Sequence, residues 1–404
     1  MDLIIKNGEI VDGTGAPKFR GDVGVKDGRI AAVGKVEGAA RRTIDAEGAI
    51  VTPGFVDIHT HYDGQVSWDA LLAPSSINGV TSTAMGNCGV GFAPARADKH
   101  DFLIRLLEGV EDIPGTALHE GLAWDWESFP DYLDALSRRA YAIDIGAHMP
   151  HAPLRSYVMG DRGADHTAAP TAEEIERMRR LTREALEVGA LGFSTTRTVF
   201  HRSRDGQNVG TLTASEEELL GVTIALKQAG KGVIQLISDA YLTDDDEFAA
   251  RELRLIRSIT EHTGRKLSFT VQQNNDAPDR WRHIFKEIAA MREAGLDVSA
   301  QVASRSIGAI LSFAATLNPF IACPTYRKIA AALQGEALIA ELKTPEVKTH
   351  ILAEHAQVNL TGNGGAITKG YACMFRMADP VDYEPAADTS LQAEADRLGR
   401  DVHD

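Results

Sequence analysis

The spacing of apolar residues changes near residue 53 and divides the chain into two parts. Residues 1 to 52 contain short apolar runs, LII, EIV, DVGV and RIAAVG, separated by turn residues such as Asp12-Gly13 and Asp27-Gly28. Asp-Gly pairs favour tight hairpins, so this part is predicted to form a small N-terminal β-sandwich module. From Pro53-Gly54 onward apolar runs alternate with amphipathic stretches, as in parallel strands joined by helices.

Seven apolar runs after residue 53 predict strands: FVDIHTH, VTSTAMGNC, AIDIGAHMP, ALGFSTT, GVIQLIS, KLSFTVQQ and DVSAQVAS. No glycine-rich nucleotide loop follows the first run, which favours a (β/α)₈ TIM-type barrel over an open dinucleotide-binding sheet. Residues 305 to 385 offer no eighth strand. We therefore expect residues 53–404 to form a barrel with about seven of its eight strands, lacking the C-terminal part. The edges of the first and last strands would be unpaired, which predicts homo-oligomers or poor solubility.

Helix boundaries can be predicted from capping residues. Thr171 stands three residues before Glu174, and Thr213 three before Glu216, and both pairs fit the reciprocal N-terminal capping box. A third helix is expected from about residue 245 to residue 262, before a glycine.

Composition narrows the class of partner. The formal net charge of −15 argues against nucleic acid or an anionic membrane surface and favours a small molecule. The first residues lack a basic leader, and no run approaches 18 apolar residues, so a cytoplasmic protein is expected. Cys88, Cys323 and Cys373 are too few and too far apart for a disulfide framework.

The run GFVDIHTHYDG, residues 54–64, ends a predicted strand on two histidines. Side chains alternate along a strand, so His59 and His61 share a face while Thr60 points the other way. Barrels place reactive groups at the C-terminal ends of strands, and imidazoles there can hold a metal that polarises an amide carbonyl and activates water. The alternative is a pair of hydrogen-bonded structural histidines, against which Asp57 on the same face and the strand-end position argue.

Four stretches resemble one family: residues 51–94 around HTHYDG and GNCG, HAPLRSYVMG at 151–160, LGFSTTR at 191–197, and YEPAADTSLQAEADRLGR at 383–400. They are similar to the amidohydrolase superfamily, in its branch of N-acyl-D-amino-acid deacylases (D-aminoacylases). The resemblance implies a metal-dependent hydrolase of carbon–nitrogen bonds other than peptide bonds, with a (β/α)₈ barrel and an N-terminal β module.

The resemblance also implies site residues. His59 and His61 would belong to the metal site, and Cys88 of GNCG would be a further ligand to one or two zinc ions or other divalent metals. A thiolate beside imidazoles suits zinc, whereas the alternative for Cys88 is a small buried hydrophobe. His151, Ser194 and Arg197 lie where the family has pocket or substrate-side residues.

Two of these three assignments, Arg197 and His151, have a competing interpretation. Arg197 could clamp a substrate carboxylate through its planar guanidinium, or it could be a solvated surface arginine. His151 could face the pocket or be a hydrogen-bonded structural histidine.

Two departures from the family pattern affect the chemistry. The family has histidine ligands at the ends of the fifth and sixth strands, but this chain has Gln235, Asp239, Gln272 and Gln273 near these positions. Carboxamides are poor zinc ligands. The family's catalytic aspartate follows the eighth strand and would lie beyond Asp404, so the general base is unknown.

The leading hypothesis is deacylation of N-acyl-D-amino acids by metal-activated hydroxide. One alternative is hydrolysis of a cyclic amide, as by a hydantoinase. A second is a barrel that has lost hydrolytic competence and has a binding role, which the missing histidines favour. A third is that the sequence is a fragment of a longer product.

Overall fold

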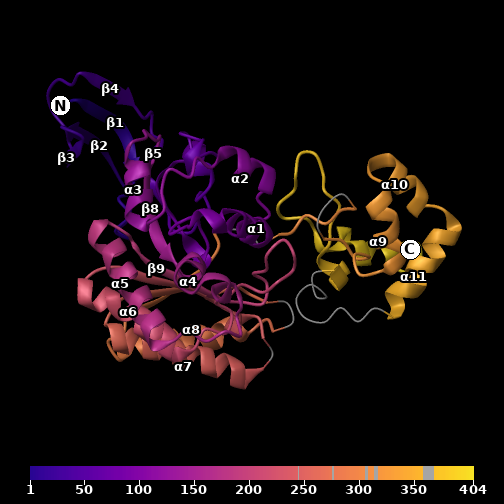
Figure 1. The fold of residues 1–404 in the computed structure, drawn as a ribbon. Helices are drawn as coiled ribbons and strands as arrows, with labels where there is room; N and C mark the ends of the chain where they lie inside the picture. The colour runs from indigo at the N-terminus through magenta and orange to yellow at the C-terminus, as the bar shows by residue number, and fades with distance from the viewer. Residues whose placement is uncertain (244, 275–276, 305–307, 314–316, 358–367) are drawn as a thin grey trace. The chain divides into compact units, whose positions relative to one another are not determined.

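The computed structural model (Figure 1) describes residues 1–404 apart from 244, 275–276, 305–307, 314–316 and 358–367. The described residues fall into two compact units, Met1–Val302 and Ala303–Asp404. The N-terminal module and all seven predicted barrel strands therefore belong to the first unit.

The N-terminal module is a five-stranded sheet in the order β3-β2-β1-β4, with β5 also paired to β1. Its strands are β1 (Leu3–Ile10), β2 (Phe19–Lys26), β3 (Arg29–Gly34), β4 (Arg42–Asp45) and β5 (Ile50–Val51). The predicted runs LII and EIV are one strand, β1, whose register shifts between Ile5 and Gly8. The predicted hairpin between β2 and β3 is confirmed, since Asp27 and Gly28 both have the positive φ that such a turn requires.

The second sheet of this unit consists of seven parallel strands in sequence order, as predicted. They are β6 (Phe55–Asp57), β7 (Val80–Met85), β8 (Asp144–Pro150), β9 (Gly192–Arg197), β10 (Val233–Ser238), β11 (Leu267–Thr270) and β12 (Val298–Gln301).

The parallel sheet is curled so that side chains beside its two end strands meet. His59 follows β6 and Gln301 ends β12, yet His59 Nδ1 lies 2.8 Å from Gln301 Oε1. The end strands themselves are not paired with each other in the described sheet. Phe55 and Val56 of β6 are about 60% exposed. This is the unpaired edge predicted from the strand count, while the oligomeric state stays a prediction.

Helices cover the parallel sheet, and α5 to α8 follow one another along it (Figure 1). The helices of this unit are α1 (His100–Glu111), α2 (Gly115–Gly121), α3 (Phe129–Ser137), α4 (His151–Met159), α5 (Ala172–Val188), α6 (Glu216–Ala229), α7 (Asp246–Thr263) and α8 (Arg280–Glu293). Strand residues such as Phe193 and Leu236 share one buried apolar core with Leu186 and Leu226 of the helices. Burial of each such side chain contributes about 2 kcal/mol to folding.

The helix starts test the predicted caps. Thr171 and Glu174 form the predicted reciprocal box at the start of α5. The prediction for Thr213 was wrong, because α6 begins two residues later than the box required: Ser215 is its cap and accepts from Glu218 N at 3.2 Å. The Thr213 hydroxyl donates instead to the carbonyl of His166.

The second unit is helical in its described part. It contains α9 (Pro324–Ala332), α10 (Gly335–Leu342), α11 (Pro345–Gln357) and α13 (Leu391–Leu398), with Cys323, Tyr326 and Ile351 in its small core. No strand occurs among its described residues, which agrees with the prediction for 305–385 except at the positions that lie outside the described residues. No disulfide joins the three cysteines in this structure. Among the described helices, none combines the length and the apolar character needed to cross a membrane.

The corrected start of α6 gives a stability prediction. Ser215→Ala should lower the free energy of unfolding by about 1 kcal/mol, because an amide of the first turn loses its acceptor. Ser215→Asp should retain most of the stability, since a carboxylate caps equally well. Urea unfolding followed by circular dichroism measures both variants. A larger loss from Thr213→Ala than from Ser215→Ala would contradict this helix start.

Candidate metal centre

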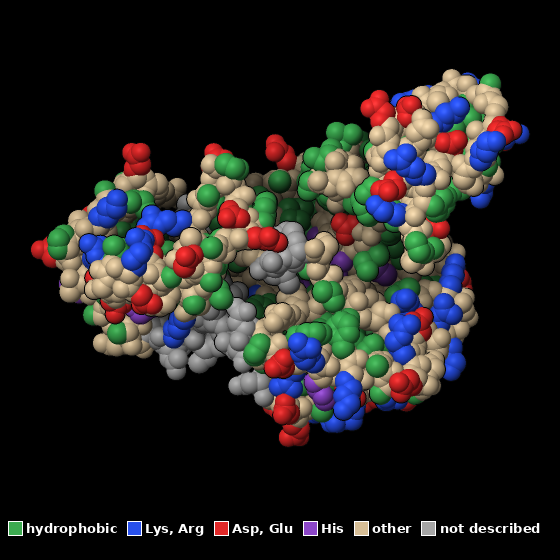
Figure 2. Space-filling model, turned by 180° about the vertical axis from the view of Figure 1, so that it is seen from behind, with side chains coloured by type: hydrophobic (Ala, Val, Ile, Leu, Met, Phe, Trp, Pro, Cys, Tyr) green, Lys and Arg blue, Asp and Glu red, His purple; other side chains and the backbone are tan. Residues whose placement is uncertain are grey.

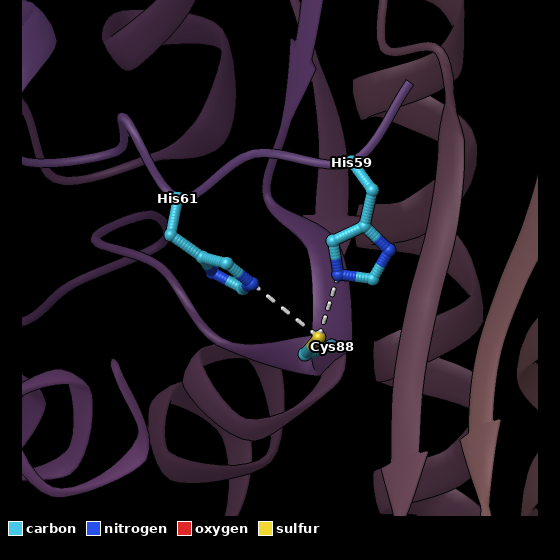
Figure 3. Close-up of side chains that lie close together, drawn as sticks. All are labelled: His59, His61 and Cys88. Carbon is cyan, nitrogen blue, oxygen red and sulfur yellow. Dashed lines mark hydrogen bonds between the residues drawn. The ribbon is translucent and has the colours of Figure 1, made fainter. Parts of the chain in front are cut away.

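Two histidine rings converge on one sulfur at the C-terminal edge of the parallel sheet (Figure 3). His59 Nε2 lies 3.0 Å from Cys88 Sγ, and His61 Nε2 lies 3.4 Å from the same atom. The predicted convergence is therefore present, but its predicted cause was wrong. Strand β6 ends at Asp57, so the histidines are presented by the following loop and not by strand alternation.

Thr60, between the histidines, anchors this loop to the neighbouring strand. Both its backbone N–H and its hydroxyl donate to the carbonyl of Ala84 in β7, at 3.1 and 2.8 Å. Asn87 Nδ2 donates in turn to the Thr60 carbonyl at 3.1 Å. Thr60 is buried, and these bonds fix the backbone between the two imidazoles.

Cys88 sits in a short 3₁₀ turn, Asn87–Gly89, directly after β7, and has a left-handed backbone with φ of 57°. Such a conformation is unfavourable for a residue with a side chain, so the surroundings must fix it. Cys88 N donates to Gln235 Oε1 at 2.7 Å, and Gly89 N donates to Ser194 Oγ at 3.0 Å. The Ser194 hydroxyl donates to the carbonyl of Gly86. Residues of β9 and β10 thus hold the turn that presents the sulfur.

Glu111 and His201 adjoin the same sulfur. Ligand atoms of Cys88, Glu111 and His201 all lie within 4.8 Å of one another, as do those of His59, His61 and Cys88. Glu111 Oε1 is also 3.1 Å from His61 Nε2. Sequence reasoning missed both residues, because Glu111 ends α1 and His201 lies in the loop after β9, with no local motif to mark either.

Burial keeps these donors neutral when no cation is present. It raises the pKa of the Cys88 thiol well above its usual value and the pKa of Glu111 to about 8. It also lowers the pKa of His61 well below its usual value and that of His201 to about 4. A bound divalent cation reverses the balance for the thiol and carboxyl and needs the imidazoles neutral. The donor set therefore fits a metal ion.

The sequence profile of the Amidohydrolase family matches residues 42–357. The chain belongs to this family. The D-aminoacylase of Alcaligenes xylosoxydans xylosoxydans is 38% identical to it over 196 residues, which cover 48% of this chain and 37% of that protein.

Two solved amidohydrolase structures resemble the fold. A D-aminoacylase crystal structure is 31% identical with a TM-score of 0.59, and the match covers 74% of this chain and 58% of that one. N-acyl-D-glutamate deacylase from Bordetella bronchiseptica, in complex with zinc and a phosphonate mimic of the tetrahedral intermediate, is 30% identical with a TM-score of 0.60 and the same coverage. The chain thus spans about half the length of the amidohydrolases it matches.

The three predicted substrate-side residues of this chain lie in internal hydrogen-bond networks. Ser194 holds the Cys88 turn, as described above. His151 is buried, with Thr195 Oγ1 2.9 Å from Nδ1 and Glu218 Oε1 3.0 Å from Nε2. Their roles toward a substrate stay predictions.

Arg197 is paired with a carboxylate of its own chain. Its Nε and Nη2 each lie 2.8 Å from a carboxylate oxygen of Glu252, and its Nη1 lies 2.5 Å from the carbonyl oxygen of Ala214. Its side chain is only 15% exposed, so it is not the solvated arginine considered as the alternative. A substrate carboxylate would have to compete with Glu252 for this guanidinium.

Of the four residues near the family's strand-five and strand-six histidines, Asp239 is the one carboxylate, and it is in neither group of possible His, Cys, Asp and Glu ligands found among the described residues. Gln235 is buried and accepts from Cys88 N, and Asp239 Oδ2 accepts from Val199 N at 2.9 Å. Strand β11 ends at Thr270, so Gln272 and Gln273 follow it instead of belonging to it as predicted.

His148, near the end of β8, predicts a pH dependence of stability. Burial, and then electrostatic interaction with His59, lower its pKa from 6.5 to about 4, and its Nδ1 has no hydrogen-bond partner among the described residues. The unfolded chain binds this proton at a higher pH than the folded chain, so stability falls as pH drops from 6.5 through 4. His148→Gln should remove up to about 1.4 kcal/mol per pH unit from that slope.

Chemical unfolding at several pH values between 4 and 7 measures this slope. The matched control is His119→Gln, because the His119 side chain is 55% exposed. An identical pH slope in His148→Gln and wild type would show that His148 is not held neutral.

Proposed function

We propose that this chain is a zinc-dependent amidohydrolase that removes the acyl group from N-acyl-D-amino acids. The observation that carries the proposal is the convergence of His59 Nε2 and His61 Nε2 on Cys88 Sγ at the edge of the curled sheet. The named activities of the D-aminoacylase and the N-acyl-D-glutamate deacylase support the substrate class. We further propose that the curled sheet is a (β/α)₈-type barrel lacking one strand, as the fold similarity suggests.

In the proposed reaction, the zinc ion and the residues of this chain have different roles. A bound zinc ion supplies Lewis-acid polarisation of an amide carbonyl and activation of water near neutral pH. His59, His61 and Cys88 would hold it, Gln301 orients the His59 ring, and Ser194 fixes the turn that carries the thiol. No residue of this chain is assigned as the general base.

A small-molecule substrate also suits the charge pattern. Lys and Arg side chains are interspersed with Asp and Glu side chains over the face in Figure 2. Together with a net charge of −15, this pattern favours a small amide over a nucleic acid.

A binding role is the second candidate. Gln235 occupies a position where the family resemblance implies a histidine ligand, and its carbonyl oxygen accepts from Cys88 N. A barrel that retains the metal but lacks a complete catalytic set could bind an N-acyl amino acid without hydrolysing it.

Activity assays distinguish hydrolysis of N-acyl-D-amino acids from binding without hydrolysis. The purified chain loaded with Zn²⁺ should release free amino acid from N-acetyl-D-amino acids faster than from the L-forms, and chelation should abolish the release until Zn²⁺ is restored. His59→Ala and His61→Ala should each lower kcat/KM at least about 100-fold, because the loss of a ligand exceeds that of an outer-shell partner. His119→Ala, on the surface, is the control.

Two outcomes would reject the proposal. Bound zinc without turnover of N-acyl-D-amino acids, N-acyl-L-amino acids or hydantoins would favour the binding role. Opening of a hydantoin ring without deacylation would favour the cyclic-amide alternative.

A further inference from the structure

In the group Cys88, Glu111 and His201, the family resemblance supplied Cys88 but neither Glu111 nor His201. The thiol comes from the turn after β7, the carboxylate from the last residue of α1, and the imidazole from the loop after β9. The resemblance implies ligands after β10 and β11, where this chain has carboxamides. The group therefore lies beside the HTH histidines but is built from other elements.

We infer that Cys88, Glu111 and His201 form a second divalent-metal position beside the one held by His59, His61 and Cys88, with the Cys88 thiolate shared between the two. The inference rests on the proposed function for the first position. It assigns Glu111 and His201 to the part that the absent strand-end histidines play in the family pattern.

The location of Glu111 favours a cation. It is the last residue of α1, where the helix dipole places partial negative charge, and Asp112 follows it. A carboxylate at that end is unfavourable unless a positive charge offsets it. Its Oε1 lies 3.1 Å from His61 Nε2, so the carboxyl group adjoins the first metal position. An ion coordinated by Glu111 would supply that positive charge.

His201 is oriented as metal-binding histidines are. Thr196 Oγ1 lies 2.8 Å from its Nδ1, which leaves Nε2 as the nitrogen available to an ion. A hydrogen bond on one ring nitrogen that fixes the other for coordination is the usual outer-shell arrangement. The Val209 N–H donates to the His201 carbonyl at 3.2 Å and fixes the backbone.

The donor types define the class of ion. One sulfur, one nitrogen and one carboxylate oxygen suit Zn²⁺ or Co²⁺, whereas Mg²⁺ and Ca²⁺ prefer oxygen ligands alone. Cobalt is the useful probe, because a thiolate bound to Co²⁺ gives a charge-transfer absorption that reports the Cys88 bond directly.

The test is a metal titration of the whole chain after chelation. Wild type should take up one equivalent of Co²⁺ more than the double variant Glu111→Gln, His201→Gln, and both should show the thiolate absorption. The double variant His59→Gln, His61→Gln should still bind one equivalent through the second position. The matched control, His119→Gln with Glu120→Gln, changes an exposed histidine and glutamate and should bind as much as wild type.

A single milder substitution covers the case in which the double variant does not fold. Thr196→Val keeps the side-chain shape but removes the hydroxyl beside His201, and it should weaken one of the two binding steps about 10-fold or more. Equal uptake by wild type and the Glu111, His201 variant would overturn the inference, as would unchanged affinities in Thr196→Val.

The readout is independent of hydrolysis. Two filled positions without turnover would reject the proposed function but retain the second position. If wild type binds a single equivalent of metal and hydrolyses substrate, and the Glu111, His201 variant has the same uptake and the same turnover, the second position is rejected and the proposed function is retained.

Discussion

The hydrogen bond between His59 and Gln301 joins the two ends of a seven-stranded sheet, and the geometry of the site depends on it. An amide oxygen only accepts, so His59 Nδ1 carries the proton and Nε2 faces Cys88 as a lone-pair donor. One contact thus links the two ends of the curled sheet and sets the tautomer of a proposed metal ligand. The curl also brings the loops after β6, β7 and β9 within reach of one sulfur.

Burial of these donors around one sulfur makes the charged thiolate and carboxylate unfavourable, and a bound cation would offset that cost. Burial raises the pKa values of Cys88 and Glu111 and lowers those of His61 and His201, which favours the neutral form of each donor. Each donor has a lone pair or a releasable proton directed into a region of low dielectric. A divalent ion favours the charged thiolate and carboxylate and the neutral imidazoles at once, which makes ion binding and local order interdependent.

The sequence predicted the parts that follow local rules. The seven strands, the hairpin at Asp27-Gly28, the cap at Thr171 and the convergence of the HTH histidines come from periodicity or short motifs, whereas the place of Cys88 beside them came from the family resemblance. Glu111 and His201 could not be predicted in this way, because a helix end and an irregular loop bring them together only in three dimensions. The error at Thr213 has a local cause: Ser215 offered a second hydroxyl two residues on, and the helix begins there.

Gln235 has a hydrogen-bonding role that a metal-binding histidine at the same position could not fill. Cys88 has a left-handed backbone, and its N–H is satisfied by Gln235 Oε1 at 2.7 Å. A neutral histidine that coordinated an ion through one ring nitrogen would carry a proton on the other, so it could not accept from that N–H. The residue at position 235 can therefore be either a histidine ligand or the acceptor for the N–H of Cys88, but not both. Among the described residues, the end of α1 and the loop after β9 also place possible metal donors, Glu111 and His201, near the sulfur.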